Sequence, residues 1–237
     1  MPKLVIDIET VGKNIDDFDD ISKDYFKDWA EKDAVSGFNI DESLSKIEDG
    51  LSFSPLTAEV VAIGMLNPDT NKGAVYYQDL DEKNKKFNEI GVTFEAMDEK
   101  SMLAGFWEQV KYYDEFITFN GRGFDIPFLI IRSAIYKIRA SKNLMSNRYL
   151  NLQPKDARHI DLQDQLQFYG ALWGKRGFNL HMFCQAFGIK TPKRHGVSGA
   201  HVKEMFLQKR YKDIARYNVD DLYATAELYK YWDQYIK

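Results

Sequence analysis

The feature that most constrains the fold is a strand, a glycine-rich turn and a helix that follow one another between residues 115 and 136. The run EFITF (115–119) has the aromatic and β-branched residues of a strand, and NGRG (120–123) is typical of a turn. Apolar residues then recur at helical spacing, with a proline early, where a helix tolerates it. Asp125 is therefore predicted in the first helical turn, at the carboxyl end of a strand, where open α/β sheets usually bind ligands. An acid there also has an ordinary role, because it favours the helix dipole.

A second pair of acids lies almost at the N-terminus. Leu4 to Ile6 predict a strand, and Asp7 and Glu9 follow two residues apart, so that both point to one face of it. Two carboxylates on one strand face repel each other and resist burial unless a cation neutralises them. The alternative is a polar strand edge with two solvated acids.

The third stretch is a C-terminal helix predicted over residues 211–235. Tyr217 and Asp221 are four residues apart and share one helix face. Asp220 lies about 100° round the helix and points elsewhere. A tyrosine between helices beside a surface aspartate is the alternative interpretation.

Together the three stretches supply four carboxylates and one tyrosine. Cleavage of a phosphodiester by two-metal catalysis requires several carboxylates around hard divalent cations and a group that orients the attacking water. An all-oxygen site suits Mg²⁺ or Mn²⁺.

The three stretches also resemble a known family. LVIDIET, FNGRGFDIPFLIIR and YNVDD are similar, in this order, to the three motifs of the DEDD superfamily of 3′–5′ exonucleases, in its tyrosine branch (DEDDy). Within that branch the chain resembles stand-alone bacterial exonucleases related to the proofreading domain of family B DNA polymerases. The similarity extends from Leu4 to about Tyr229. The sister branch has a histidine five residues before the last aspartate, where this chain has Arg216.

The resemblance implies a role for each catalytic candidate. Asp7 would bridge two metal ions. Glu9 and Asp221 would complete the first metal site, and Asp125 would support the second through water. Tyr217 would orient the nucleophilic water without acting as a strong base, because the unperturbed pKa of tyrosine is about 10. Two ions per site, Mg²⁺ or Mn²⁺, are implied.

The charge distribution predicts how a nucleic acid would be held. Residues 1–120 carry 12 lysines, no arginine and 26 acids, a net charge of −14, whereas residues 121–237 carry 20 cations and 10 acids, a net charge of +10. The stretch 130–160 holds seven cations, and backbone neutralisation with aromatic stacking holds single strands. An ordinary solvated helix and loop is the alternative. The candidate substrate-binding residues are Thr10, Asn120, Arg139 and Lys142.

Element order predicts an α/β chain that forms a single 3′–5′ exonuclease domain over residues 1–237, with an acidic insertion at about residues 14–50. The resemblance sharpens this to a ribonuclease H-like fold, with a mixed, mostly parallel five-stranded sheet flanked by helices. The predicted strands are 3–8, 59–67, 73–79, 115–119 and 158–161. The predicted helices are 97–113, 124–136, 162–169, 179–187 and 211–235.

Composition narrows the class of protein further. The sequence has no apolar run of about 18 residues, so a membrane span is not expected. Met-Pro-Lys leads into the first strand, so a secretory signal is not expected either. Cys184 is the only cysteine, and a reducing cytoplasm is the expected compartment.

Three functions remain open at the level of sequence. The first is a 3′–5′ exonuclease on single-stranded DNA or frayed ends, and the second is the same chemistry on RNA. The third is a non-catalytic nucleic-acid-binding module. Sequence does not separate DNA from RNA, because recognition of the 2′-hydroxyl depends on pocket geometry. A polymerase or repair protein is a candidate partner in trans.

Overall fold

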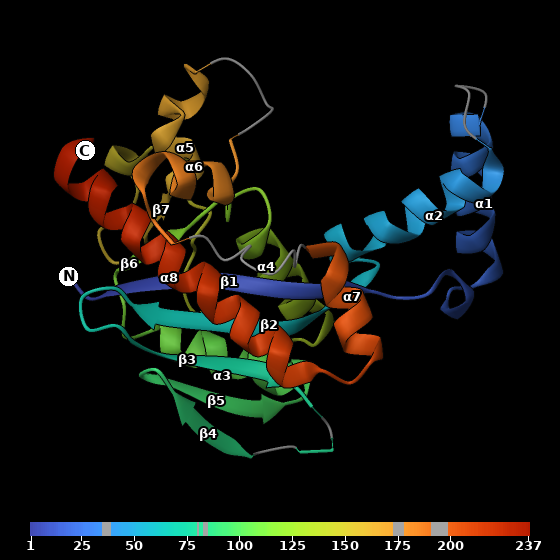
Figure 1. Ribbon diagram of the computed structural model, residues 1–237, viewed down its shortest axis with the longest axis horizontal. Coiled ribbons are helices and arrows are strands. Elements are labelled where there is room, and N and C mark those ends of the chain that lie inside the picture. Colours follow the sequence, from blue (N-terminus) through green and yellow to red (C-terminus); the bar gives the residue numbers. More distant parts are fainter. Residues whose placement is uncertain (35–38, 80, 83–84, 173–177, 191–198) are drawn as a thin grey trace.

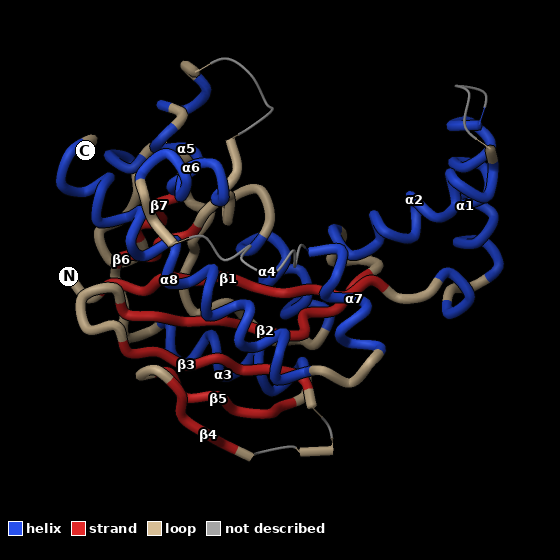
Figure 2. The backbone as a smooth tube through the Cα atoms, viewed as in Figure 1, coloured by secondary structure: helices blue, strands red, loops and turns tan. Residues whose placement is uncertain are grey.

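In the computed structural model, strands form one central sheet that helices cover on both faces (Figures 1 and 2). The structure describes residues 1–34, 39–79, 81–82, 85–172, 178–190 and 199–237. Within these residues the sheet has seven strands in the order β4-β5-β3-β2-β1-β6-β7. Their bounds are β1 Lys3–Gly12, β2 Ala58–Asn67, β3 Lys72–Gln78, β4 Lys86–Glu89, β5 Val92–Met97, β6 Glu115–Thr118 and β7 Arg158–Asp161.

The middle of the sheet has the predicted topology. Strand β1 runs antiparallel to β2 and parallel to β6, which is parallel to β7. Strands β2 and β3 form an antiparallel hairpin. The five strands β3-β2-β1-β6-β7, with β2 reversed between its neighbours, correspond to the five predicted strands and give the ribonuclease H-like arrangement.

The prediction of a five-stranded, mostly parallel sheet is wrong in both respects. The described sheet has seven strands, and its six pairs divide into three parallel and three antiparallel. The two additional strands form a hairpin, β4–β5, whose turn places Ile90 at φ 51° and Gly91 at φ 78°. A β-branched residue is unusual at positive φ, so the sequence carries only half of the usual turn signal. Phe87 and Phe94 stack across this hairpin with centroids 4.6 Å apart.

The helices agree with the predictions in four cases. These are α3 (Glu99–Val110), α4 (Asp125–Ile135), α6 (Leu180–Phe187) and α8 (Tyr211–Tyr235). The helix predicted at 162–169 ends sooner, because α5 (Leu162–Leu166) gives way to a 3₁₀ turn. The remaining described helices are α1 (Asp20–Ala34), α2 (Ile40–Gly50) and α7 (Gly199–Leu207).

Alternation along β1 divides the core into two layers. Leu4, Ile6 and Ile8 pack in the cluster that includes α3 and α4, on one face of the sheet. Val5 and Val11 pack in the cluster beneath α8, on the other face. Because Asp7 and Glu9 share the parity of Val5, the two acids lie on the face that α8 covers.

The segment predicted as an acidic insertion forms a helical arm. Helices α1 and α2 pack against each other and project away from the sheet (Figure 1). Phe26 and Ala30 are buried between them. Lys203 of α7 pairs with Glu48 of α2 at 2.8 Å, where the arm joins the body.

Among the described helices, none combines the length and apolarity needed to cross a membrane.

A buried histidine joins two strands at the β7 edge of the sheet. His159 places Nε2 2.8 Å from Thr118 Oγ1 and Nδ1 3.0 Å from the carbonyl oxygen of Leu144. Burial lowers the pKa of His159 to about 3. The ring is therefore neutral, with Nδ1–H donating to Leu144 and Nε2 accepting from the threonine hydroxyl.

Because His159 is neutral in the folded protein, we predict that the free energy of unfolding decreases in acid. Between pH 6.5 and 3 the unfolded chain takes up a proton on His159 that the folded chain does not, so the free energy of unfolding falls as pH falls. His159→Gln should reduce that slope by roughly 1.4 kcal/mol per pH unit over this range. Urea unfolding at pH 7, 6 and 5 measures the slope, with His201→Gln as an exposed-histidine control. Parallel pH profiles for the wild type and His159→Gln would contradict a neutral buried ring.

Candidate active site

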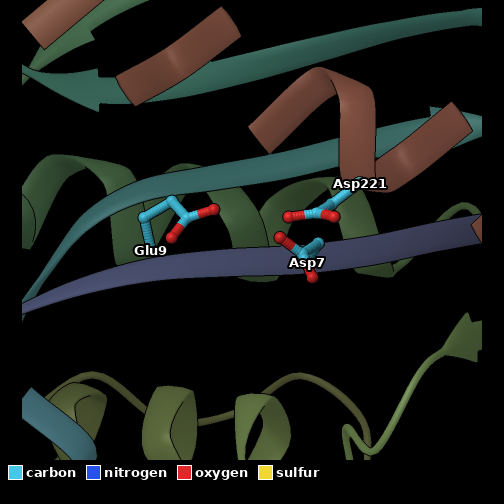
Figure 3. Close-up of side chains that lie close together, drawn as sticks. All are labelled: Asp7, Glu9 and Asp221. Atoms are coloured by element: carbon cyan, nitrogen blue, oxygen red, sulfur yellow. The ribbon is translucent and has the colours of Figure 1, made fainter. Parts of the chain in front are cut away.

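Strand β1 and helix α8 bring three carboxylates together. One oxygen each from Asp7, Glu9 and Asp221 lies within 4.8 Å of the other two. Figure 3 shows the carboxylates of Asp7 and Asp221 turned toward one another, with Glu9 extending from the same face of β1. Residues more than two hundred positions apart meet because α8 packs across β1 and β2.

Asp125 lies near this group on α4, the helix that packs on the face of the sheet opposite α8. As predicted, it lies in the first turn of α4. Its Oδ1 accepts a hydrogen bond of 3.0 Å from the backbone N–H of Ile8, the residue between the two acids of β1. Asp125 is outside the tight group of three, although it lines the same hollow as Asp7 and Asp221.

Burial and mutual repulsion raise the pKa values of these acids. Desolvation is the main cause for Asp7 and Glu9, and the charges of Asp221 and Asp125 add to it. Burial raises the pKa of Asp125 to about 7. Removal from water and like charges both disfavour the ionised forms, and a divalent cation would reverse both effects. The donor set is all carboxylate oxygen and fits a hard cation such as Mg²⁺ or Mn²⁺.

Tyr217 lies one helical turn before Asp221 on α8. Its burial, followed by the charges of Asp221, Glu9 and Asp7, raises its pKa well above the usual value. A hydrogen bond to Asp221 contributes to the same shift. The phenol therefore stays protonated near neutral pH, so it can donate a hydrogen bond but does not act as a base.

Asn218 is a site residue that sequence analysis missed. Its Nδ2 donates a hydrogen bond of 2.8 Å to Oδ2 of Asp7, and it is fully buried. Gly64 of β2, the Cα partner of Asp7, makes room for it, since a Cβ there would overlap Asn218 Oδ1. The available signal was spacing, because Asn218 precedes Asp221 by three residues and so shares its helix face.

The loop after β6 forms another wall of the site. Asn120 adopts φ 63°, and its backbone N–H donates to Asp161 Oδ1 at 2.8 Å. The backbone N–H of Arg122 donates to the other oxygen at 2.9 Å. Asp161, which sequence analysis also missed, therefore fixes this loop from the end of β7. Asn120 lines the same hollow as Asp7 and Asp125, and its role in substrate binding stays a prediction.

Thr10 has a different position from the one expected of a substrate ligand. Its hydroxyl donates to the carbonyl oxygen of Ser52 at 2.7 Å, and Gly12 N–H donates to the Ser52 hydroxyl. The pairing of β1 with β2 shifts register between Glu9 and Thr10, an irregularity of the kind found beside active sites. Thr10 thus anchors the turn that carries Phe53.

We call the space in front of the carboxylates the catalytic hollow. Its volume is about 420 Å³. Four acids line it together with the aromatic rings of Phe53, Phe119 and Phe124. A polar floor beneath aromatic walls suits a nucleotide, whose phosphate would meet the floor and whose base would meet the rings.

The structure does not bring Lys142 to the catalytic hollow. Its ammonium donates to the carbonyl oxygens of Tyr113 and Asp156, at the amino ends of β6 and β7. The carboxylates lie further along the sheet, beyond the carboxyl end of β6. Arg139 is exposed in the same connection, and its role in substrate binding stays a prediction.

Three arginines of the basic stretch are also paired. Arg132 is buried and binds both oxygens of Glu99, at 2.8 and 2.6 Å. The other two pairs are Arg148 with Asp164 and Arg158 with Glu115. The expected basic face therefore does not form from the stretch as a whole.

Comparisons with known proteins agree with this geometry. The model of a family described as "Predicted 3'-5' exonuclease related to the exonuclease domain of PolB" matches residues 53–234. DNA polymerase 1 of Sulfolobus acidocaldarius is 26% identical over 135 residues, which cover 54% of this chain and 15% of the polymerase. The structure of the family B DNA polymerase from Pyrobaculum calidifontis matches with a TM-score of 0.57 at 17% identity, over 98% of this chain and 24% of that one. The last likeness concerns the fold, and the chain spans less than a quarter of either polymerase.

Repulsion among the carboxylates predicts how the protein responds to metal. Asp7→Asn should unfold at a higher temperature than the wild type at pH 8 without divalent cations, by roughly 2–4 °C for each kcal/mol of repulsion relieved. Mn²⁺ should raise the unfolding temperature of the wild type and leave that of Asp7→Asn nearly unchanged, because the variant lacks a ligand. Calorimetry with and without Mn²⁺ measures both, with Asp220→Asn as the control. A metal-free Asp7→Asn less stable than the wild type would contradict the repulsion.

Proposed function

Since the chain belongs to the family of predicted 3′–5′ exonucleases related to the exonuclease domain of PolB, we propose that it is a metal-dependent enzyme of the tyrosine branch. It hydrolyses phosphodiester bonds from the 3′ end of single-stranded DNA or frayed ends and releases nucleoside monophosphates. The observation that carries the proposal is the meeting of Asp7, Glu9 and Asp221 within 4.8 Å beneath a hollow of nucleotide size.

The residues divide the chemistry among them. Asp7, Glu9 and Asp221 would hold Mg²⁺ or Mn²⁺, and Asp125 would support a second ion. Two bound ions would lower the pKa of the attacking water and neutralise the leaving oxygen. The water attacks the phosphorus of the terminal nucleotide, and the bond to the 3′ oxygen of the preceding nucleotide breaks.

The protonated hydroxyl of Tyr217 orients that water. Because its pKa is raised, it contributes position and not proton abstraction. Asn218 supports the site differently, since its amide holds one oxygen of Asp7 and leaves the other for metal. A partner of this kind, beside a ligand, keeps the carboxylate in one orientation.

The terminal nucleotide occupies the catalytic hollow, with Asn120 as its polar contact. We further propose that residues 1–237 act as a single exonuclease domain. A cytoplasmic location and a polymerase or repair partner in trans stay predictions.

The activity test uses strands of defined ends. Single-stranded DNA, duplex DNA and single-stranded RNA, each labelled at the 5′ end, should be incubated with Mg²⁺, Mn²⁺ or EDTA. Single-stranded DNA should shorten in single-nucleotide steps from the 3′ end with either metal, EDTA should stop the reaction, and a 3′-phosphate should inhibit it. Rapid cutting of circular single strands would replace the proposal with an endonuclease, and faster digestion of RNA would change the substrate class.

Two substitutions test the assigned roles. Asp7→Ala should lower kcat by roughly 10³-fold or more, because it removes a carboxylate that would hold the metal. Tyr217→Phe should lower kcat by only about tenfold, the effect of one lost hydrogen bond. Asp220→Asn, one residue from a metal ligand but on another side of the helix, is the matched control. Near-normal turnover by a folded Asp7→Ala protein would exclude the proposed mechanism.

A further inference from the structure

A second hollow adjoins the catalytic hollow and shares two of its lining residues, Asn120 and Gly123. We call it the upstream hollow, and its volume is about 610 Å³. The side chains that face it beyond the shared wall include Arg122, Arg148 and Gln167. The two spaces are therefore adjacent parts of one surface, separated only by the loop after β6.

Arg122 has spare hydrogen-bonding capacity in this hollow. A guanidinium has five N–H donors. Among the described residues, the Arg122 guanidinium makes one hydrogen bond, a long one of 3.4 Å to the carbonyl oxygen of Leu144. Burial lowers the pKa of Arg122, while the charges of Asp164 and Asp161 act in the opposite direction. The oxygens of the nearby Asp161 accept the backbone N–H groups of the loop, and the structure shows no bond from the Arg122 guanidinium to them.

Arg148 provides a second, exchangeable cation. It forms a two-bond pair with Asp164, at 2.9 and 2.5 Å, and its side chain is 52% exposed. The side chain of Asp164 is less exposed, at 17%. An arginine binds phosphate with the same fork geometry as carboxylate, so a phosphate that enters the upstream hollow can share the exposed guanidinium of Arg148 with Asp164.

The two hollows differ in charge, because two arginines and two aspartates (Asp161 and Asp164) line the upstream hollow, whereas four acids line the catalytic hollow. No lysine or arginine is among the described residues that line the catalytic hollow, whose acids repel a phosphate backbone. A strand longer than one nucleotide needs cations close to that hollow. Of the seven cations in the stretch 130–160, Arg148 alone is among the described residues that line the adjoining upstream hollow. The upstream hollow shares a wall with the catalytic hollow, and its arginines are therefore close enough to bind the phosphate of the next nucleotide in a strand.

We propose that the upstream hollow is the subsite for the nucleotide on the 5′ side of the scissile bond, with Arg122 binding its phosphodiester group. The proposal rests on the proposed function. It adds Arg122 as a residue that makes nucleic-acid strands better substrates than isolated nucleotide esters. Asp161 acts as a positioning residue, because it fixes the backbone of Arg122 and Asn120 at one carboxylate.

Substrate length provides the test. The p-nitrophenyl ester of thymidine 5′-monophosphate has one phosphodiester bond and no upstream nucleotide, whereas a thymidine dodecamer has both. Arg122→Met should raise KM for the dodecamer by roughly tenfold or more, which is the effect of losing a charged hydrogen bond. Its kcat on the dodecamer, and its KM for the ester, should stay within about twofold of wild type. Arg122→Lys should give an intermediate KM, because the charge remains and the fork is lost.

Binding without cleavage provides a readout independent of activity. The affinity of the labelled dodecamer is measured by fluorescence anisotropy with Ca²⁺ across a salt series. Arg122→Met should weaken binding and reduce the slope of log affinity against log salt by about 0.7, the value for one single-strand phosphate. Arg210→Met, which removes an exposed arginine outside both hollows, should change neither quantity. Urea unfolding checks that each variant is folded.

The outcomes separate the two proposals. A wild type that binds the dodecamer and hydrolyses neither substrate would overturn the proposed function, while the salt slope would still decide the role of Arg122. Equal increases in KM for dodecamer and ester would place Arg122 at the scissile nucleotide and overturn the upstream assignment. An unchanged KM and salt slope in Arg122→Met, or absence of strand binding by the wild type, would overturn it as well.

Discussion

Three carboxylates that repel one another, one buried (Glu9) and two half-buried (Asp7 and Asp221), are the constraint that the rest of this structure satisfies. Asp7 and Glu9 leave the same face of β1, and α8 brings Asp221 against them, so that burial and like charge both raise the pKa values of the β1 pair. The surrounding fold maintains this unfavourable arrangement by packing: the layers on both faces of β1 are apolar and buried. A metal ion would bind to carboxylates that the fold has already assembled, so that its binding energy would not be needed to order them.

The hydrogen bonds around the site hold its parts in register. Asn218 joins α8 to Asp7, and the bond from Ile8 N–H joins the start of α4 to β1. Asp161 joins the loop after β6 to β7. Each of these hydrogen bonds joins two elements that are far apart in the sequence and meet only in the folded state. Gly64 shows how strict the fit is, because any side chain there would occupy the position of the Asn218 amide.

Much of the geometry of the candidate site could be predicted because its signals are local. The spacing of Asp7 and Glu9 follows from strand alternation, and that of Tyr217 and Asp221 from the helical turn. The missing parts depend on contacts between distant segments. Asn218 becomes a site residue only once α8 is known to cross β1 beside Gly64. The β4–β5 hairpin was missed for a different reason, since Ile90 adopts a backbone conformation that sequence patterns do not associate with isoleucine.

Charge is where sequence and structure differ most. The sum over the C-terminal half predicts a basic face, yet Arg132 and Arg158 are paired with Glu99 and Glu115, which lie in the acidic half. The asymmetry between the two halves of the chain is thus partly cancelled by pairing across the fold. A count of cations cannot distinguish an arginine that holds two elements together from one with donors to spare. That distinction depends on the acceptors around each guanidinium. For this reason we expect Arg122, in the turn before Asp125, to contribute more to substrate binding than the paired arginines of the basic stretch that follows it.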